Sequence, residues 1–350
     1  MAAAQVRGVR QSQVLTNAAI EPLPSGLIAE GEVVDVAGLA SLLKKFWRKK
    51  RFTGRRVLLG VANQKIVVRT MEFPVIDEKE LRAAVEFQAQ EHIPIPVEEA
   101  VLDYQVTSTF TDEEGKGRQR ILLVAAQRDM IGQFVEVARR AGLTVDGIDL
   151  QAFALARALS PPVHVSAADG PAGAATALVN IGSGITNLVV VVGETPQFTR
   201  VISLGSESLI DALAADRGVD RSEGWRLAVT VGLSGPAEEL PADVTQEAAA
   251  AIRASLEGTC ETFSDEIRRS VDYYHTQAHE GQIGRVLLTG DGSIVRNMTA
   301  HLSQALHLSV ELASPLERLA DNKSRVKAAE LEAMAPRLAI ALGLALDDEG

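Results

Sequence analysis

The sequence predicts an α/β fold built from two related halves, with a small α/β subdomain inserted in the first half. Three observations lead to this prediction. Residues 177–204 contain three consecutive segments that are rich in β-branched residues and separated by Gly or Pro turns, which is typical of antiparallel strands. Helical and strand-like segments then alternate up to residue 346, which indicates a sheet covered by helices. The first half repeats this order in part and is interrupted by residues 64–142.

The second half, residues 177–346, is expected to begin with a three-strand meander and a short helix from Ser206 to about Gly218. A long helix is expected from about Thr245 to His279, because apolar residues recur there three or four positions apart, except across Cys260. The three strands of the meander are Ala177–Ile181, Ile185–Val192 and Gln197–Leu204. The later elements are, in order, a strand, a helix, a strand and a helix: Arg285–Leu288, Ile294–Leu306, Leu308–Leu312 and Ala335–Leu346.

This order is that of an RNase H-like fold, the half-unit of the actin class. The first half, residues 1–63 and 143–160, gives a partial copy of it. Its strands and helices are expected at Val6–Val9, Val14–Pro22, Val36–Phe46, Arg56–Val61, Leu143–Leu150 and Gln151–Leu159. Val6–Val9 corresponds to the second strand of the meander. The first strand is therefore missing from this half, and we expect residues upstream of Met1 to encode it.

The insertion, residues 64–142, has the order strand, helix, strand, strand, helix. Its helices are expected at Glu78–His92 and Met130–Ala141, and the loop Asp112–Gly117 joins its middle strands. Residues 161–176, rich in Pro, Ala and Gly, are expected to link the two halves.

Composition narrows the class of function. The chain has 350 residues and a net charge of −11, which opposes general binding to nucleic-acid phosphates. Cys260 is the single cysteine, so no intramolecular disulfide can form, which fits a reducing compartment.

Four segments, taken in order, resemble the PilM family of type IV pilus assembly proteins. They are FPVIDEKELRAAVEFQAQEHIPIPVEEAVLDYQV (Phe73–Val106), RILLVAAQRDMIGQFVEVARRAGL (Arg120–Leu143), VNIGSGITNLVVV (Val179–Val191) and PRLAIALGLAL (Pro336–Leu346). The resemblance runs from about Val6 to Leu346. It implies an actin-like ATPase fold related to FtsA, in a protein at the cytoplasmic face of the inner membrane. It also implies binding of the N-terminal tail of a PilN-like membrane protein, and self-association into a ring or filament.

In folds of this class the nucleotide lies between the halves, so the resemblance implies a site for ATP with Mg²⁺ on two Gly-containing loops. Glycine lets backbone N–H groups approach anionic oxygens, and a helix N-terminus favours an anion. The candidate residues are Asn180, Gly182, Ser183, Gly184, Thr186, Asn187, Gly290, Gly292 and Ser293. The alternatives are an ordinary hairpin turn at residues 182–184 and an ordinary strand–helix loop at residues 289–293.

Two departures from the family pattern weaken the expectation of catalysis. The Asp-Ile-Gly-Thr-like first phosphate loop is not in the sequence, and Asn180 stands where an aspartate is expected. An amide supplies no negative charge for Mg²⁺. We therefore expect weak or absent ATP hydrolysis and a scaffold function. An active actin-like ATPase and an FtsA-like division protein are the alternatives. The second of these would need a C-terminal amphipathic helix, whereas this sequence ends in Asp-Asp-Glu-Gly.

The partner's tail is expected to bind between the first-half core and the insertion. The candidate residues are Val67, Arg69, Phe87 and Gln88, with the alternative that Val67 and Phe87 belong to the core. Acidic residues of the helix Glu78–His92 would attract a basic peptide end.

Three weaker patterns have ordinary explanations beside functional ones. The basic run Lys44–Arg51 either complements a helix dipole or attracts anionic lipid, with Phe46 and Trp47 at the interface. His275 and His279 have the spacing of a metal pair, but a solvated helix end explains them better. Cys260, on an apolar stripe, is expected to be a small core residue.

Overall fold

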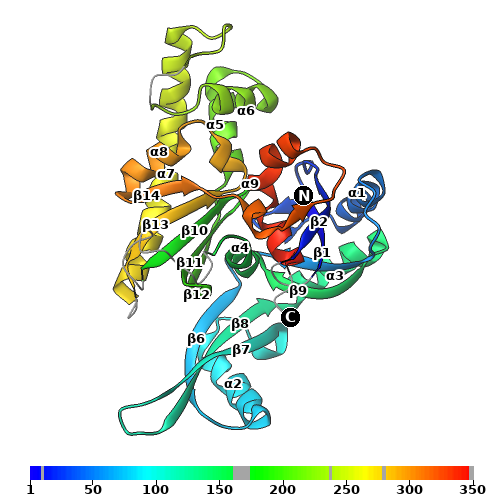
Figure 1. Ribbon diagram of the computed structural model, residues 1–350, viewed down its shortest axis with the longest axis vertical. Helices are drawn as coiled ribbons and strands as arrows, with labels where there is room; N and C mark the ends of the chain where they lie inside the picture. The colour runs from blue at the N-terminus through cyan, green and yellow to red at the C-terminus, as the bar shows by residue number, and fades with distance from the viewer. Residues whose placement is uncertain (9–11, 161–173, 236–238, 278–280, 347–350) are drawn as a thin grey trace. The chain divides into compact units, whose positions relative to one another are not determined.

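The computed structural model describes residues 1–8, 12–160, 174–235, 239–277 and 281–346 (Figure 1). The chain forms two compact units. Unit 1 contains residues 1–25, 46–62 and 146–350, and unit 2 contains residues 26–45 and 63–145. Most of the linker predicted at 161–176 lies outside the described residues, and its last two positions are the start of a strand.

A five-stranded sheet forms the centre of the second half and confirms the predicted meander (Figure 1). Its strands are β10 (Ala175–Ile181), β11 (Thr186–Val192), β12 (Thr195–Ile202), β13 (Ile283–Thr289) and β14 (Ser309–Leu312). The order is β12-β11-β10-β13-β14, with antiparallel pairs on one side of β10 and parallel pairs on the other. All seven residues of β10 are buried, as expected for a central strand covered on both faces.

Helices cover both faces of this sheet. On one face, α5 (Ser206–Arg217), α6 (Arg221–Thr230) and α7 (Gln246–Gln277) share a core with alternate residues of β10 and β11. The predicted stripe of α7 is entirely buried in that core. On the other face, α4 (Gln151–Leu159) contacts the meander, and α9 (Ala328–Ala345) contacts β13 and packs against α4. The helix α8 (Met298–Leu306) lies between β13 and β14 in the chain.

The first half contains two separate small sheets. One has the order β1-β2-β15, formed by Ala2–Arg7, Val14–Ile20 and Asp321–Asn322. The other pairs β5 (Arg56–Val61) with β9 (Thr144–Leu150). By element order, β1 and β2 correspond to β11 and β12, and β5 and β9 correspond to β13 and β14. Among the described residues no strand takes the position that β10 holds in the second half.

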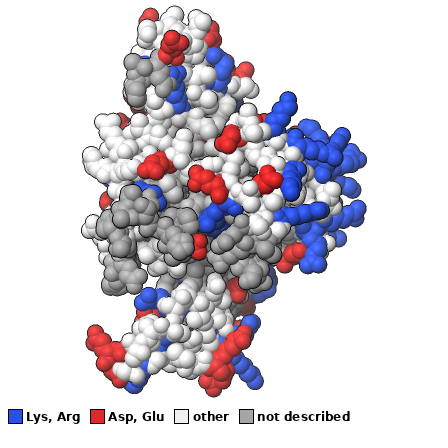
Figure 2. All heavy atoms as spheres, viewed as in Figure 1, with Lys and Arg blue, Asp and Glu red and all other residues white. Residues whose placement is uncertain are grey.

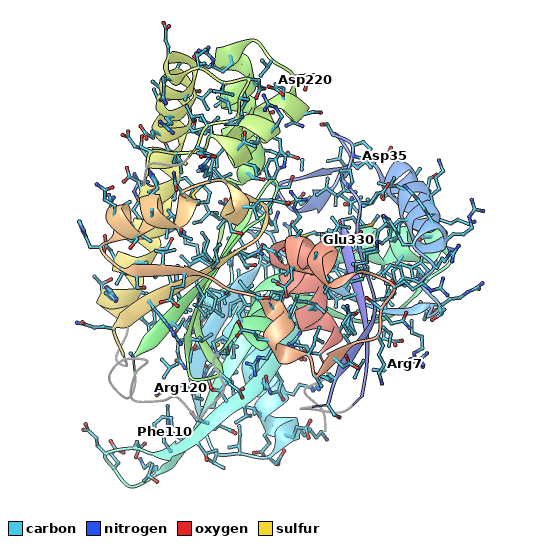
Figure 3. All side chains as sticks on the ribbon, turned by 45° about the horizontal axis from the view of Figure 1, so that its top comes forward. Arg7, Asp35, Phe110, Arg120, Asp220 and Glu330 are labelled. Atoms are coloured by element: carbon cyan, nitrogen blue, oxygen red, sulfur yellow. The ribbon has the colours of Figure 1, made fainter. Side chains whose placement is uncertain are left out.

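Unit 2 contains the antiparallel sheet β6-β8-β7, formed by Val67–Pro74, Gly117–Gln127 and Ala100–Thr111. The helix α2 (Glu78–His92) packs on one face, where Phe73, Leu81 and Leu123 are buried. The helix α3 (Arg128–Ala141) and the short strands β3 (Ile28–Ala29) and β4 (Glu32–Val33) complete the unit. At the far end of the β7–β8 hairpin, the guanidinium of Arg120 lies 5.3 Å from the Phe110 ring centroid (Figure 3). The order of elements in the insertion, which is β6, α2, β7, β8 and α3, is the predicted order strand, helix, strand, strand, helix.

Two helices differ from the sequence prediction. The helix α6 was not predicted, although Asp220 caps it by accepting a hydrogen bond from the backbone N–H of Glu223. The helix α9 begins at Ala328 rather than at the predicted Ala335. It therefore contains Pro336 in its interior, a position that proline rarely occupies. No helix among the described residues is both long and apolar enough to span a membrane.

Candidate functional site

The two candidate nucleotide loops meet at Ile181, the last residue of β10. A Cβ added to Gly290 would lie 2.4 Å from the carbonyl oxygen of Ile181, and one added to Gly292 would lie 2.2 Å from its Cγ2. Gly290 also has a φ of 92°, which residues with a side chain rarely adopt. Both glycines are therefore needed for close packing of the second loop against β10, whether or not a ligand binds.

The first loop, residues 182–185, is closed by its own hydrogen bonds and by α5. The carbonyls of Gly182 and Ser183 accept hydrogen bonds from the backbone N–H groups of Ser206 and Glu207, both at 2.9 Å. The Ser183 hydroxyl donates to a carboxylate oxygen of Glu207 at 2.7 Å. The first N–H groups of α5 are thus used within the protein and are not free to bind a phosphate.

The other candidate donors are also occupied. The Thr186 hydroxyl donates to the carbonyl of Leu204 at 2.8 Å, and the Ser293 hydroxyl donates to that of Gly290 at 2.7 Å. The Asn187 side chain is 1% exposed, and its Nδ2 donates to Oε1 of Gln151 at 3.0 Å. No sequence pattern pointed to Gln151, since its role depends on α4 lying against the sheet.

Asn180 and Gly184 remain open. The Asn180 side chain is 5% exposed and has no hydrogen-bond partner among the described residues. Its Oδ1 would lie 3.8 Å from a Cβ placed on Gly182, so it lies beside the first loop. A Cβ placed on Gly184 would have no atom within 4 Å, so this corner of the loop faces open space.

The carboxylate of the second loop is neutralised within the protein. Asp291 forms an ion pair with Arg337 of α9 at 2.6 Å, and the same guanidinium lies 5.2 Å from the centre of the Trp225 ring. In the described part of the chain, no cluster of three or more His, Cys, Asp or Glu residues could hold a metal ion. The Asp291 carboxylate is therefore paired within the protein, and Asn180 places an amide rather than a carboxylate beside the first loop.

The four candidate peptide-binding residues lie at different depths of unit 2. Val67 is 8% exposed and belongs to the core between α2 and the sheet. Arg69, on the same strand, is exposed, and Gln88 is half-buried. Phe87, on the outer side of α2, is 68% exposed. An exposed aromatic side chain of this size is unusual on a helix whose other face is well packed, so Phe87 is the strongest of the four as a binding residue.

The weaker patterns have structural explanations. Cys260 is buried in the core of the second half, and burial raises the pKa of its thiol to about 12. The Nε2 of His275 accepts a hydrogen bond from the backbone N–H of Ile283 at 3.2 Å, and His279 lies outside the described residues.

Placing Phe46 and Trp47 at a lipid interface is wrong. Phe46 is 1% exposed, and Trp47 stacks on Phe52 with ring centroids 4.6 Å apart. The Trp47 Nε1 also donates to the carbonyl of Gly54 at 2.7 Å. Both side chains therefore belong to the end of α1 (Val36–Lys49) and pack against the residues that follow this helix.

Comparison with known proteins gives the family. Residues 2–349 match the family described as type IV pilus assembly protein PilM. The structure is similar to a chain of a PilM-PilN type IV pilus biogenesis complex, with a TM-score of 0.79, 24% identity and coverage of 98% of this chain and 93% of that one. It is also similar to the ethanolamine utilization protein EutJ from Carboxydothermus hydrogenoformans, with a TM-score of 0.52, 13% identity and coverage of 99% and 89%.

MreB5 of Spiroplasma citri bound to ADP has a TM-score of 0.49, 12% identity and coverage of 91% and 76%. The fold is actin-like, with an α/β subdomain in the first half, as the order of elements predicted. Because the family match extends over nearly the whole length, this chain belongs to the PilM family of type IV pilus assembly proteins.

Proposed function

We propose that this protein is a scaffold of type IV pilus assembly. It binds the cytoplasmic N-terminal tail of a PilN-like protein at the cytoplasmic face of the inner membrane. Membership of the PilM family supports this proposal, and a chain of similar fold was solved as a PilM-PilN complex. The observation in this chain that carries the proposal is the exposure of Phe87 on α2 of unit 2.

The surface around Phe87 suits a peptide with an apolar side chain and a basic end. The helix α2 and the residue before it carry exposed carboxylates at Asp77, Glu78, Glu80, Glu86 and Glu91. Such a surface steers a basic peptide electrostatically, and the attraction weakens as salt is added. Burying one apolar anchor against Phe87 contributes about 1.5–3 kcal/mol to binding.

The backbone of an extended tail can be held by a strand edge. In the sheet β6-β8-β7, β6 pairs with β8 on one side and has no second strand partner among the described residues. Main-chain hydrogen bonds to such an edge give affinity that is independent of sequence, and flanking side chains give specificity. Arg69, which is exposed on β6, is positioned to fix a peptide carbonyl or carboxylate beside this edge.

Titration of the purified protein with a synthetic tail peptide tests this proposal. We expect Phe87→Ala to weaken binding at least tenfold with little effect on the melting temperature, because the side chain is exposed. Gln90→Ala, at an exposed position of the same helix, is the matched control and should bind like the wild type. The absence of binding to the wild type would overturn the scaffold proposal. Normal binding by the double variant Phe87→Ala, Arg69→Ala would overturn only the assigned surface.

We further propose that nucleotide binding is weak and that ATP hydrolysis is negligible. The donors of Thr186, Asn187 and Ser293 are used internally, and Asn180 offers an amide where a carboxylate would position Mg²⁺. Loss of one transition-state donor already costs about 3–4 kcal/mol in catalysis. Steady ATP turnover by the purified protein, abolished by Asn180→Ala, would favour the ATPase alternative instead.

A further inference from the structure

The surface around the end of α1 is strongly basic, although the protein as a whole is acidic. Residues 36–61 contain eight Lys or Arg residues and no Asp or Glu, while the whole chain carries a net charge of −11. Figure 2 shows this concentration of Lys and Arg over α1, at the right of the view. The basic surface consists of Lys44, Lys45, Arg48, Lys49, Lys50, Arg51, Arg55 and Arg56.

Nearby carboxylates neutralise only part of this charge. Lys49 and Lys50 form ion pairs with Glu21 at 3.0 and 3.5 Å, and Arg56 forms one with Asp146 at 2.7 Å. The other five cations are exposed and form no ion pair with a described residue. The helix dipole favours cations only within the last turn of α1, so it does not account for Arg51 and Arg55.

Arg51 occupies a backbone position at which glycine would be favoured. Its φ is 58°, in the left-handed region, two residues after Lys49, the last residue of α1. Glycine is the usual residue at such a helix end, because a Cβ is disfavoured there. A cation is thus present at a position where the fold alone would favour glycine.

The aromatic side chains of this segment do not face outward. Phe46 and Phe52 are buried, and Trp47 is stacked and hydrogen-bonded. The surface therefore offers charge without an outward-facing aromatic side chain to anchor in lipid or to stack on a base, and Leu58 is the large apolar side chain that residues 36–61 expose. This combination fits electrostatic contact with a layer of anionic groups better than it fits recognition of single-stranded nucleic acid.

We propose that the basic surface binds the anionic headgroups of a lipid bilayer. Clusters of four to eight Lys and Arg residues bind anionic bilayers, and each cation contributes roughly a fivefold gain in affinity. The proposal rests on the proposed function for one point, namely that the protein operates next to a membrane. The lipid contact and the peptide contact use different residues, so they can be tested separately.

Vesicle flotation of the full chain tests the proposal. The wild type is expected to float with vesicles that contain phosphatidylglycerol, not with pure phosphatidylcholine vesicles, and to be released as salt is raised. The variant Arg48→Gln, Arg51→Gly, Arg55→Gln should bind at least tenfold more weakly. Its fold should be intact, because glycine suits the conformation at position 51. The control variant Lys323→Gln, Arg325→Gln, Lys327→Gln removes the same charge from exposed positions elsewhere and should bind like the wild type.

Equal flotation with neutral and anionic vesicles would overturn the proposal, and so would undiminished binding by the variant of the basic surface. Tighter binding to duplex DNA at the same salt, lost in the same variant, would assign the surface to nucleic acid and would also overturn it. Titration with the tail peptide separates the two proposals. If vesicles bind and the peptide does not, only the scaffold proposal fails.

Discussion

The side chain of Asn187 on β11 donates a hydrogen bond to Gln151, the first residue of α4, with 3.0 Å between Nδ2 and Oε1. The Nε2 of Gln151 in turn donates to the carbonyl of Gly60 on β5 at 3.2 Å. A single side chain thus connects strands of both halves within unit 1. It also engages the Nδ2 of Asn187, one of the residues predicted to bind phosphate.

Replacing Gln151 by Ala should lower the free energy of unfolding by about 1–3 kcal/mol, because the buried Asn187 amide would lose its partner. Chemical denaturation monitored by circular dichroism measures this change. Gln197→Ala, at an exposed position of β12, is the control and should differ little from the wild type. If both variants are equally stable, the hydrogen bond makes no net contribution.

The crossing of α4 and α9 depends on the absence of a side chain at position 343. A Cβ there would lie 1.8 Å from the carbonyl oxygen of Ala154. Gly343→Ala should therefore destabilise the protein by about 3 kcal/mol, because the helices must separate. Gly258→Ala, in α7 where a Cβ would meet nothing within 4 Å, should instead be slightly stabilising. Thermal unfolding of the two variants gives the comparison, and similar melting temperatures would contradict the close crossing.

The Cys260 thiol should be unreactive in the folded protein. Burial raises its pKa to about 12, whereas the thiol of the unfolded chain has its ordinary pKa of about 9.0. The neutral form is favoured by folding, so this contribution to stability is complete below pH 9 and is lost as pH rises toward 12. Labelling with a chromogenic disulfide at pH 8 should be slow for native protein and fast in denaturant. Rapid labelling of the native protein would show that the thiol is accessible.

Both β1 and β5 have an edge without a strand partner among the described residues. An extended segment with the composition of β10, fused before Ala2 through a short turn, should pair with the free edge of β1 and raise the melting temperature by several degrees. A control fusion with Pro at alternate positions cannot donate those hydrogen bonds and should have no effect. Equal melting temperatures for the two fusions would mean that the edge of β1 does not accept a strand.

The sequence predicted regular elements well where one pattern dominated. The stripe of α7 and the β-branched runs of β10 and β11 are examples, and their burial follows the pattern. Prediction failed where a residue had an unusual context. The last helix was predicted to start at Ala335, but α9 starts at Ala328 and contains Pro336, whose carbonyl accepts hydrogen bonds from Gly290 N–H and the Thr289 hydroxyl.

The candidate nucleotide site shows the same limit. Gly182, Gly290 and Gly292 were predicted to bring backbone N–H groups close to a nucleotide, and the structure shows in addition that a Cβ at each would clash with residues 181 or 185. The use of Thr186 and Asn187 was not predictable, because their partners, Leu204 and Gln151, are distant in the chain. No local pattern indicated that Arg337 would form an ion pair with Asp291 of the second loop. Local sequence specifies which atoms can hydrogen-bond, whereas the tertiary fold decides which of them remain available.

The contact between Gly343 and Ala154 also determines how α4 and α9 can move. Because Gly343 has no side chain, the backbones of the two helices come into direct contact at this position. Arg157 of α4 donates to the carbonyl of Gly343 at 2.9 Å, which adds a hydrogen bond to this close contact. Rotation about the contact would keep both interactions, whereas sliding would break them. We therefore expect any relative motion of α4 and α9 to be a rotation about this contact rather than a shear.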